Sequence, residues 1–299
     1  MAGSLRNLVR SVMPDGMRRR LREASNIRPG TVFRWLTAEL RDFPDFVCIG
    51  AGKSGTTALC RYLIEHPCVL PAWRKEVGYF SLRYHKGPRW YRSQFPLRAT
   101  KRRIARRHGG VCLTGEATPY YLSHPDAARR MHELLPDVKL FALLRNPVDR
   151  AISHYYHTLR VGSENLPIEE AIEAEKERLA GIEERLRKDP SYANSDHSRF
   201  SYVGRGLYVD QLKQWHKYYP REQLLVIKAE DFFADPRSVF HQVLEFLGLP
   251  PWEPEAFPPH NVGKYAERHE ALRKRLAEVF EPHNRRLYEY LGVEWRWED

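Results

Sequence analysis

The sequence predicts one α/β domain in which a central parallel sheet carries helices on both faces. Two short apolar segments, residues 46–50 and 138–144, each run into a turn that is followed by a helical pattern. Repeated strand–turn–helix units of this kind are typical of parallel sheets. The 299 residues, 42% of them hydrophobic, are enough for one sizeable core, and no repeat or low-complexity tract divides them. We therefore expect a ligand at the carboxyl ends of the strands.

The first unit predicts a phosphate-binding strand–loop–helix of the P-loop type. The apolar segment Phe46–Gly50 leads into a turn of Gly, Ser and Thr residues that contains one lysine, Lys53, and a helix is expected to follow. The start of a helix presents unpaired N–H groups and the positive end of its dipole. The glycines allow the backbone to approach an anion closely, and Lys53 adds a mobile positive charge.

This loop differs from that of the ATP and GTP hydrolases. The pattern G-x-x-x-x-G-K-[ST] requires glycine at position 47, where the chain has Val47. Those enzymes also need an aspartate after a neighbouring strand to hold Mg²⁺, whereas the segment 138–144 is followed by Arg145. A cation at that position suits a second phosphate group. A small-molecule kinase with a degenerate phosphate loop remains the alternative enzyme.

The second unit supplies further phosphate-binding candidates. Arg145 follows the strand at 138–144, Pro147 occupies an early position of the next helix, and Ser153 lies two turns along it. Here the chain resembles a known family, the sulfotransferases that use 3′-phosphoadenosine 5′-phosphosulfate (PAPS). Arg145 with Ser153 resembles their 3′-phosphate clamp, and their 5′-phosphosulfate loop is similar to Lys53, Ser54, Gly55, Thr56 and Thr57.

Other segments resemble, in order and spacing, the heparan-sulfate-type and bacterial carbohydrate sulfotransferases. They lie within residues 44–297 and are Lys75–Phe80, Tyr84–Tyr91, Gly115–Tyr121, Gly206–Tyr208 with Trp215, and Asn261–Tyr265. One position departs from that group. Ala117 stands where a lysine often follows the glutamate near the cofactor and the acceptor. The identity of the acceptor therefore does not carry over.

The resemblance implies a reaction and its main participants. PAPS would donate a sulfuryl group to a hydroxyl or amine of a carbohydrate or another small molecule, and leave as adenosine 3′,5′-bisphosphate (PAP), without a metal ion. Lys53 would stabilise the leaving phosphate. Glu76 would take the proton of the acceptor, in a partly apolar cleft that its neighbours Tyr79 and Phe80 suggest.

Further site residues follow from the same resemblance, with alternatives. His85 is either a rival base or a residue that binds the acceptor. Glu116 either positions the acceptor or Lys53 or makes a structural hydrogen bond, and Trp90 either contacts the acceptor or belongs to the core. Gly263 with Lys264 resembles a late loop over the 3′-phosphate of the cofactor.

Residues 1–41 are predicted to form a basic arm, and residues 42–299 the sulfotransferase domain. The arm holds nine arginines against three acidic residues, and so carries six of the eleven net positive charges. Its first helical pattern is basic and amphipathic, of the kind that lies on membranes: Leu5, Leu8, Val9 and Val12 form the apolar face, with Arg6 and Arg10 beside it. We favour an arm that packs on its own domain or is loosely ordered, with peripheral contact to a membrane or a partner as the alternative.

The remaining features concern partners and location. The basic cluster at 101–108 is interpreted as a solvated helix face, and no motif for nucleic acid accompanies the charge. A non-catalytic binder of polyanions remains the alternative from another class. Cysteines at 48, 60, 68 and 112 indicate buried thiols. Because no apolar run is long enough for a membrane span or a signal-peptide core, we expect a cytoplasmic protein, either free or attached to a membrane by the arm.

Two expectations concern the second half of the chain. Residues 164–201 are predicted to form a surface helix followed by a polar loop, because spaced apolar residues interrupt a charged background. An amphipathic helix is expected after residue 265.

Overall fold

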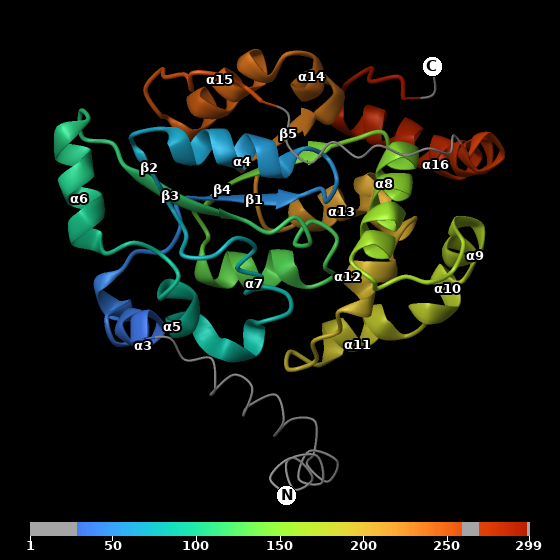
Figure 1. Cartoon of the computed structure of the whole chain (residues 1–299), viewed down its shortest axis with the longest axis horizontal. Helices are drawn as coiled ribbons and strands as arrows, with labels where there is room; N and C mark the ends of the chain where they lie inside the picture. Colours follow the sequence, from blue (N-terminus) through green and yellow to red (C-terminus); the bar gives the residue numbers. More distant parts are fainter. Residues whose placement is uncertain (1–28, 259–268, 298–299) are drawn as a thin grey trace, which may run out of the picture.

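The computed structural model describes residues 29–258 and 269–297, and within them five strands form one parallel sheet (Figure 1). The strands are β1 (Phe46–Gly50), β2 (Val69–Pro71), β3 (Leu113–Ala117), β4 (Lys139–Leu144) and β5 (Leu224–Lys228). Their order in the sheet is β2-β3-β1-β4-β5, and every pairing is parallel. The predicted α/β architecture and both predicted strand–turn–helix units are confirmed.

The central strand β1 sends alternate side chains to the two faces of the sheet. Phe46 and Cys48 pack in one hydrophobic cluster with α4 (Thr56–Glu65) and α15 (Pro236–Leu247). Val47 and Ile49 pack in a second cluster with α7 (Ala127–Leu134) and α13 (Tyr208–Trp215). Figure 1 shows α4 and α15 on one side of the sheet and α7 on the other. Burial on both faces explains why β1 is apolar without alternation.

The helix that follows β4 begins where the sequence predicts. In α8 (Pro147–Arg160), Pro147 takes the first helical position, and the side chain of Asn146 accepts hydrogen bonds from the backbone N–H groups of Val148 and Asp149. This cap satisfies donors that would otherwise lack partners. The N-terminal end of α8 is therefore held beside the carboxyl end of β4.

The prediction of one surface helix and a loop for residues 164–201 was wrong. This stretch forms four short helices, α9 (Ile168–Glu173), α10 (Glu175–Arg178), α11 (Ile182–Lys188) and α12 (Asp196–Phe200). Gly181, in the left-handed region with φ 71°, separates α10 from α11. Two carboxylates also turn inward, since Glu164 accepts a hydrogen bond from Arg178 and Glu175 accepts from the backbone N–H of Gly204.

Part of the predicted arm packs on the domain. Residues 1–28, which contain its amphipathic pattern, lie outside the described residues, whereas 29–41 form α3 (Pro29–Leu36), η1 (Ala38–Leu40) and a buried Arg41. Arg34 donates to the carbonyl of Ser93 at 2.8 Å, and Arg41 donates to that of Phe95 at 2.6 Å. These contacts tie residues 29–41 to the segment after α5 (Gly87–Arg92).

The remaining elements complete the fold. The basic cluster lies on α6 (Arg98–Arg107), none of whose residues is buried, so the prediction of a solvated helix face is confirmed. The expected last helix is α16 (Glu270–Leu291). All four cysteines are free, and three of them are buried. Within residues 29–258 and 269–297, no helix has the length and apolar character to cross a membrane. The other elements are η2 (Tyr84–Lys86), η3 (Gly204–Gly206), η4 (Arg221–Gln223) and α14 (Ala229–Ala234).

Candidate functional site

A cavity of about 1260 Å³ opens at the carboxyl ends of the central strands. Gly52 and Lys53 line it from the loop after β1, Thr118 from the loop after β3, and Arg145 from the end of β4. The adjoining helix α8 contributes Ser153. The cavity therefore lies where a parallel sheet is expected to bind its ligand.

The lining of this cavity is strongly basic. Among the described residues, one acidic side chain, Glu76, faces seven basic ones, namely Lys53, Lys75, Arg83, Arg145, Arg160, Arg199 and Arg205. Like charges that share a partly buried hollow repel one another and have lost some of their hydration. A bound anion with several negative charges relieves both costs, so the electrostatics favour such a ligand.

Two residues predicted to perform chemistry have unusual backbone conformations. Lys53 has φ 75° and Glu76 has φ 51°. In the described part of the chain, Lys53 and Glu76 are two of the four non-glycine residues with positive φ. Side chains disfavour this left-handed region, and residues held there cluster at functional sites. Both residues line the cavity, so the strain coincides with the basic hollow.

Lys53 lies among the other cations that line the cavity. Burial, followed by the neighbouring cations Arg160 and Arg145, lowers the pKa of Lys53 to about 8. Arg145 donates from Nη1 to the carbonyl of Lys53 at 3.3 Å. The backbone carbonyl of Arg145 in turn accepts a hydrogen bond from Tyr208. The two predicted phosphate-binding segments are therefore connected directly.

The rest of the predicted loop divides into two groups. Gly55, Thr56 and Thr57 line the cavity at the start of α4, and Lys75 donates to Oγ1 of Thr57 at 3.1 Å. Ser54 does not line it. Its side chain is fully buried, and its Oγ has no hydrogen-bond partner among the described residues. The predicted contact of the Ser54 hydroxyl with a phosphate is therefore not supported by this geometry.

Glu76 lines the cavity, but its surroundings differ from the prediction. Its side chain is 57% exposed and lies 3.9 Å from Nζ of Lys75. The cavity is partly apolar as expected, since Leu82 and Phe232 also line it. The carboxylate is nevertheless well exposed, because its apolar neighbours Val77 and Phe80 point into the core and the backbone at Glu76 adopts the left-handed conformation. The carboxylate instead faces the basic wall of the cavity.

His85 and Trp90 do not line the cavity. His85 is exposed on η2, and Trp90 is half-buried and packs against the core cluster that includes Tyr79. Nζ of Lys86 lies 5.4 Å from the centre of the Trp90 ring. The predicted contacts of His85 and Trp90 with an acceptor therefore do not fit this cavity, since neither side chain reaches it.

Glu116 is a buried carboxylate beneath the cavity. It accepts hydrogen bonds from Tyr91 at 2.9 Å, from Tyr121 at 3.0 Å and from Thr118 at 2.7 Å. Burial raises the pKa of Glu116 to about 7, although these hydrogen bonds oppose the shift. This geometry corresponds to the structural alternative and not to contact with an acceptor. Gly263 and Lys264, the predicted 3′-phosphate loop, lie outside the described residues.

Arg205 is a site residue that the sequence reasoning missed. Its side chain is buried on η3, and Nη1 donates to the carbonyl of Ser198 at 2.9 Å. Its guanidinium lies 5.5 Å from the centre of the Tyr120 ring. A Cβ built on Gly52 would lie 2.6 Å from its Nη2, so this cation lies directly against the predicted phosphate loop. The adjacent Gly206 belonged to a recognised motif, which was the available signal.

One end of the cavity is aromatic. Phe232 and Phe233 on α14 approach the loop so closely that a Cβ on Gly55 would lie 2.8 Å from a ring atom of Phe233. Phe233 is also 48% exposed, which leaves its ring available to a ligand. Tyr62, Pro236 and Phe257 complete this end. A flat apolar group joined to phosphates would match such a surface.

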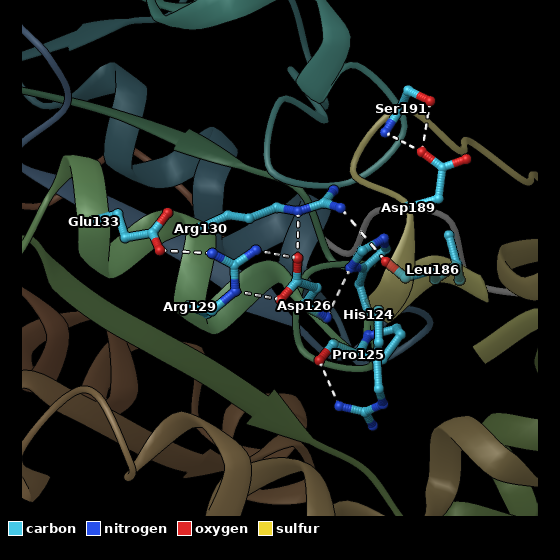
Figure 2. Close-up of polar contacts among 10 residues, drawn as sticks. His124, Pro125, Asp126, Arg129, Arg130, Glu133, Leu186, Asp189 and Ser191 are labelled. Atoms are coloured by element: carbon cyan, nitrogen blue, oxygen red, sulfur yellow. Dashed lines mark hydrogen bonds and ion pairs between the residues drawn. The ribbon is translucent and has the colours of Figure 1, made fainter. Parts of the chain in front are cut away.

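A polar network supports the loop that leads from β3 to α7 (Figure 2). Asp126 accepts hydrogen bonds from Arg129 and Arg130, both on α7, and its backbone N–H donates to Nδ1 of His124 at 3.2 Å. Arg187 on α11 donates to the carbonyl of Pro125 at 2.9 Å. The network joins α7 to α11 and holds the segment that follows the cavity-lining residues 118–120.

Comparison with known proteins is consistent with this site. The family model described as a sulfotransferase domain matches residues 43–258. The chain is 27% identical to the membrane-associated sulfotransferase kil1 of Dictyostelium discoideum, over 94% of this chain and 72% of that protein. It is 31% identical to heparan sulfate glucosamine 3-O-sulfotransferase 6 of Homo sapiens, over 86% of this chain and 74% of that protein. Among solved structures, a sulfotransferase from Alicyclobacillus acidocaldarius matches with a TM-score of 0.65 and 30% identity, covering 86% of this chain and 100% of that one.

Proposed function

This chain belongs to the sulfotransferase family and is a transferase, and from that premise we propose that it moves the sulfuryl group of PAPS to a carbohydrate or another small hydroxylated or amine-bearing acceptor. The observation that carries the proposal is the cavity itself, whose described lining residues include seven Lys and Arg side chains, one carboxylate and an aromatic end. PAPS has the corresponding parts, since it joins a flat base to a phosphosulfate and a second phosphate.

The described residues fit this donor. Lys53 and the start of α4 would hold the 5′-phosphosulfate through positive charge and backbone N–H groups. Arg145 and Ser153 would hold the 3′-phosphate, and Phe233 would lie against the adenine. Among the described residues, four of the seven lining cations have no carboxylate within 4.0 Å, whereas Lys75, Arg145 and Arg199 have one. An anionic ligand would supply the missing counter-charge.

The transfer requires a base and a stabilised leaving group. The acceptor oxygen or nitrogen forms a bond to sulfur as the bond from sulfur to the 5′-phosphate oxygen breaks, and the electron pair of that bond stays on the phosphate. We propose that Glu76 receives the proton of the acceptor and that Lys53 neutralises charge on the leaving oxygen. Both side chains line the same cavity, which supports this assignment.

The proposed class of acceptor is inferred from the named proteins to which this chain is similar. Proteins named for 3-O-sulfation of heparan sulfate glucosamine are 31% and 30% identical to this chain. We propose a carbohydrate acceptor on that basis. Ala117, at the position where the similar enzymes often have lysine, leaves the particular sugar open.

Binding and transfer assays test the function directly. The protein should bind PAP more tightly than ATP and should transfer labelled sulfate from PAPS to a carbohydrate in excess EDTA. Tighter binding of ATP, or activity that chelation abolishes and Mg²⁺ restores, would favour the kinase alternative. Steeply salt-dependent binding of heparin with no affinity for PAP would favour a polyanion-binding protein.

Arg145→Ala should weaken PAP binding selectively. Arg145 follows β4 and shares the cavity with Ser153, so its loss removes a charge-assisted hydrogen bond to the 3′-phosphate. The expected cost is about 2 kcal/mol in PAP affinity, measured by calorimetry, with little change for an analogue that lacks the 3′-phosphate. Equal losses for both ligands would remove Arg145 from that phosphate.

We also propose a cytoplasmic location with peripheral membrane contact through the arm. A membrane-associated relative and the basic amphipathic pattern at residues 5–12 support this contact. Because residues 29–41 pack on the domain, the test removes residues 1–28 only. The truncated protein should keep its turnover on a soluble acceptor and bind anionic liposomes more weakly. Unchanged liposome binding would contradict the proposal.

A further inference from the structure

Arg205 is a buried cation without a carboxylate partner. Its side chain is 8% exposed, and no Asp or Glu oxygen lies within 4.0 Å of it in the part of the chain that the structure describes. Of the other buried arginines among the described residues, Arg130 is neutralised by Asp126 at 2.7 Å. Arg41 and Arg150 have no carboxylate of these residues within 4.0 Å either, but neither of them lines the cavity. An unpaired buried charge is costly, so its presence at a cavity wall calls for an anionic ligand group.

The guanidinium is held in one place by its neighbours. Nη1 donates to the carbonyl of Ser198, and the plane of Tyr120 lies beneath it at 5.5 Å. Oη of Tyr120 is hydrogen-bonded to Nδ1 of His197 at 2.8 Å, and Nε2 of His197 lies 3.3 Å from a carboxylate oxygen of Glu183. This chain of contacts keeps the position of Arg205 defined before any ligand binds.

Its position along the phosphate loop is also informative. Arg205 lies against Gly52, the residue immediately before Lys53, whereas the helix start that would bind the 5′-phosphate begins at Thr56. Glu76, the proposed base, is close enough to raise the pKa of Arg205, although burial, the larger effect, and then Arg150 lower it to about 10. Arg205 therefore lies against the residue before the loop lysine, in the same cavity lining as the proposed base.

We propose that Arg205 is a catalytic residue that binds the non-bridging oxygens of the sulfuryl group during its transfer. This inference rests on the proposed function. As the acceptor forms its bond to sulfur and the bond to the 5′-phosphate breaks, negative charge stays on the three sulfuryl oxygens while new charge grows on the phosphate. Lys53 serves the phosphate and Arg205 serves the sulfuryl oxygens. A planar guanidinium in a buried site suits this task, because its charge is fixed and its donors are preorganised.

The first test separates the sulfuryl group from the rest of the donor. Arg205→Gln should lower kcat about 10²-fold or more, the scale of one lost transition-state donor, while PAP, which lacks the sulfuryl group, binds within about twofold of the wild type. The matched control is Arg221→Gln, which also removes an arginine that donates to a carbonyl and lies over a tyrosine ring, but which is outside the cavity lining. It should leave kcat unchanged.

The second test moves Arg205 without removing it. The Cβ of Gly52→Ala would overlap Nη2 at 2.6 Å, and the end of a flexible side chain can shift aside. Gly52→Ala should therefore lower kcat in the wild type and have little further effect in Arg205→Gln. Residues that act on the same event are non-additive, so this double-mutant cycle reports the contact itself.

The possible results distinguish a failure of the proposed function from a failure of the proposed role of Arg205. A wild-type protein without PAP binding or sulfate transfer would refute the proposed function, whatever the variants do. With an active wild type, an unchanged kcat in Arg205→Gln, or a loss of PAP affinity equal to the loss of activity, would overturn the role of Arg205. If Arg205→Gln fails to fold, a normal kcat in Gly52→Ala would overturn it, and a reduced kcat with normal PAP affinity would support it.

Discussion

Glu76→Gln is expected to lower kcat by about 10²-fold or more, the usual range for loss of a general base. Glutamine keeps the shape and hydrogen bonding of the side chain but cannot accept the proton of the acceptor. Glu76 is the one acidic residue of the described cavity lining, and it lies among cations that would bind the donor. Steady-state rates with labelled PAPS, together with PAP affinity by calorimetry, measure the effect. PAP affinity should hold.

His85→Asn is the matched control for the base. Sequence resemblance alone made His85 a rival, but the structure places it on η2 outside the cavity lining. Its replacement should therefore change kcat less than Glu76→Gln does. A dead His85→Asn protein beside a nearly normal Glu76→Gln protein would transfer the role of base to His85.

Lys53→Gln should reduce kcat by about 10²-fold to 10³-fold, because the leaving phosphate oxygen would lose the cation that we propose neutralises it. The titration of the same lysine should also determine how kcat/KM changes with pH on the alkaline side. Its pKa is lowered to about 8 by burial and by Arg160 and Arg145, so in the free enzyme it is charged below that pH and loses its charge above it. We therefore expect kcat/KM to fall as the pH rises through about 8.

Lys53→Arg provides the control for charge. Arginine stays protonated throughout this pH range, so the alkaline fall in kcat/KM should disappear even if the absolute rate is reduced. The measurement is a profile of kcat/KM from pH 6 to about 10 for both proteins. An alkaline limb that persists in Lys53→Arg would show that another group titrates there.

The parts of the site that are local in sequence could be predicted from it. The loop at Lys53 is contiguous with its strand and its helix, and the apolar run and the glycines specify both neighbours. Arg145 was predictable for the same reason, since it ends a strand and Pro147 begins the next helix. Short-range backbone preferences decide such units, and they hold whatever the rest of the chain does.

The parts that depend on exposure were harder to predict. Glu76 has apolar neighbours in sequence, yet those side chains enter the core and the carboxylate faces the cavity with 57% exposure. Glu116 and Trp90 show the reverse, because their motifs suggested a ligand, whereas packing places both against the core. Adjacent residues can point to opposite sides, and their sequence pattern alone does not say which side is the cavity.

By itself, the sequence determined the α/β class, the phosphate loop and the family, because contiguous segments encode backbone conformation and its hydrogen-bond donors. Only the tertiary structure decided which charges share one hollow. Arg205 is distant in sequence from Gly52 and Tyr120, yet in the fold it lies against Gly52 and its guanidinium lies near the ring of Tyr120. No local sequence pattern joins these three residues. Contacts between distant segments depend on how the sheet orders its strands and on what packs beneath each loop, and these are properties of the whole fold.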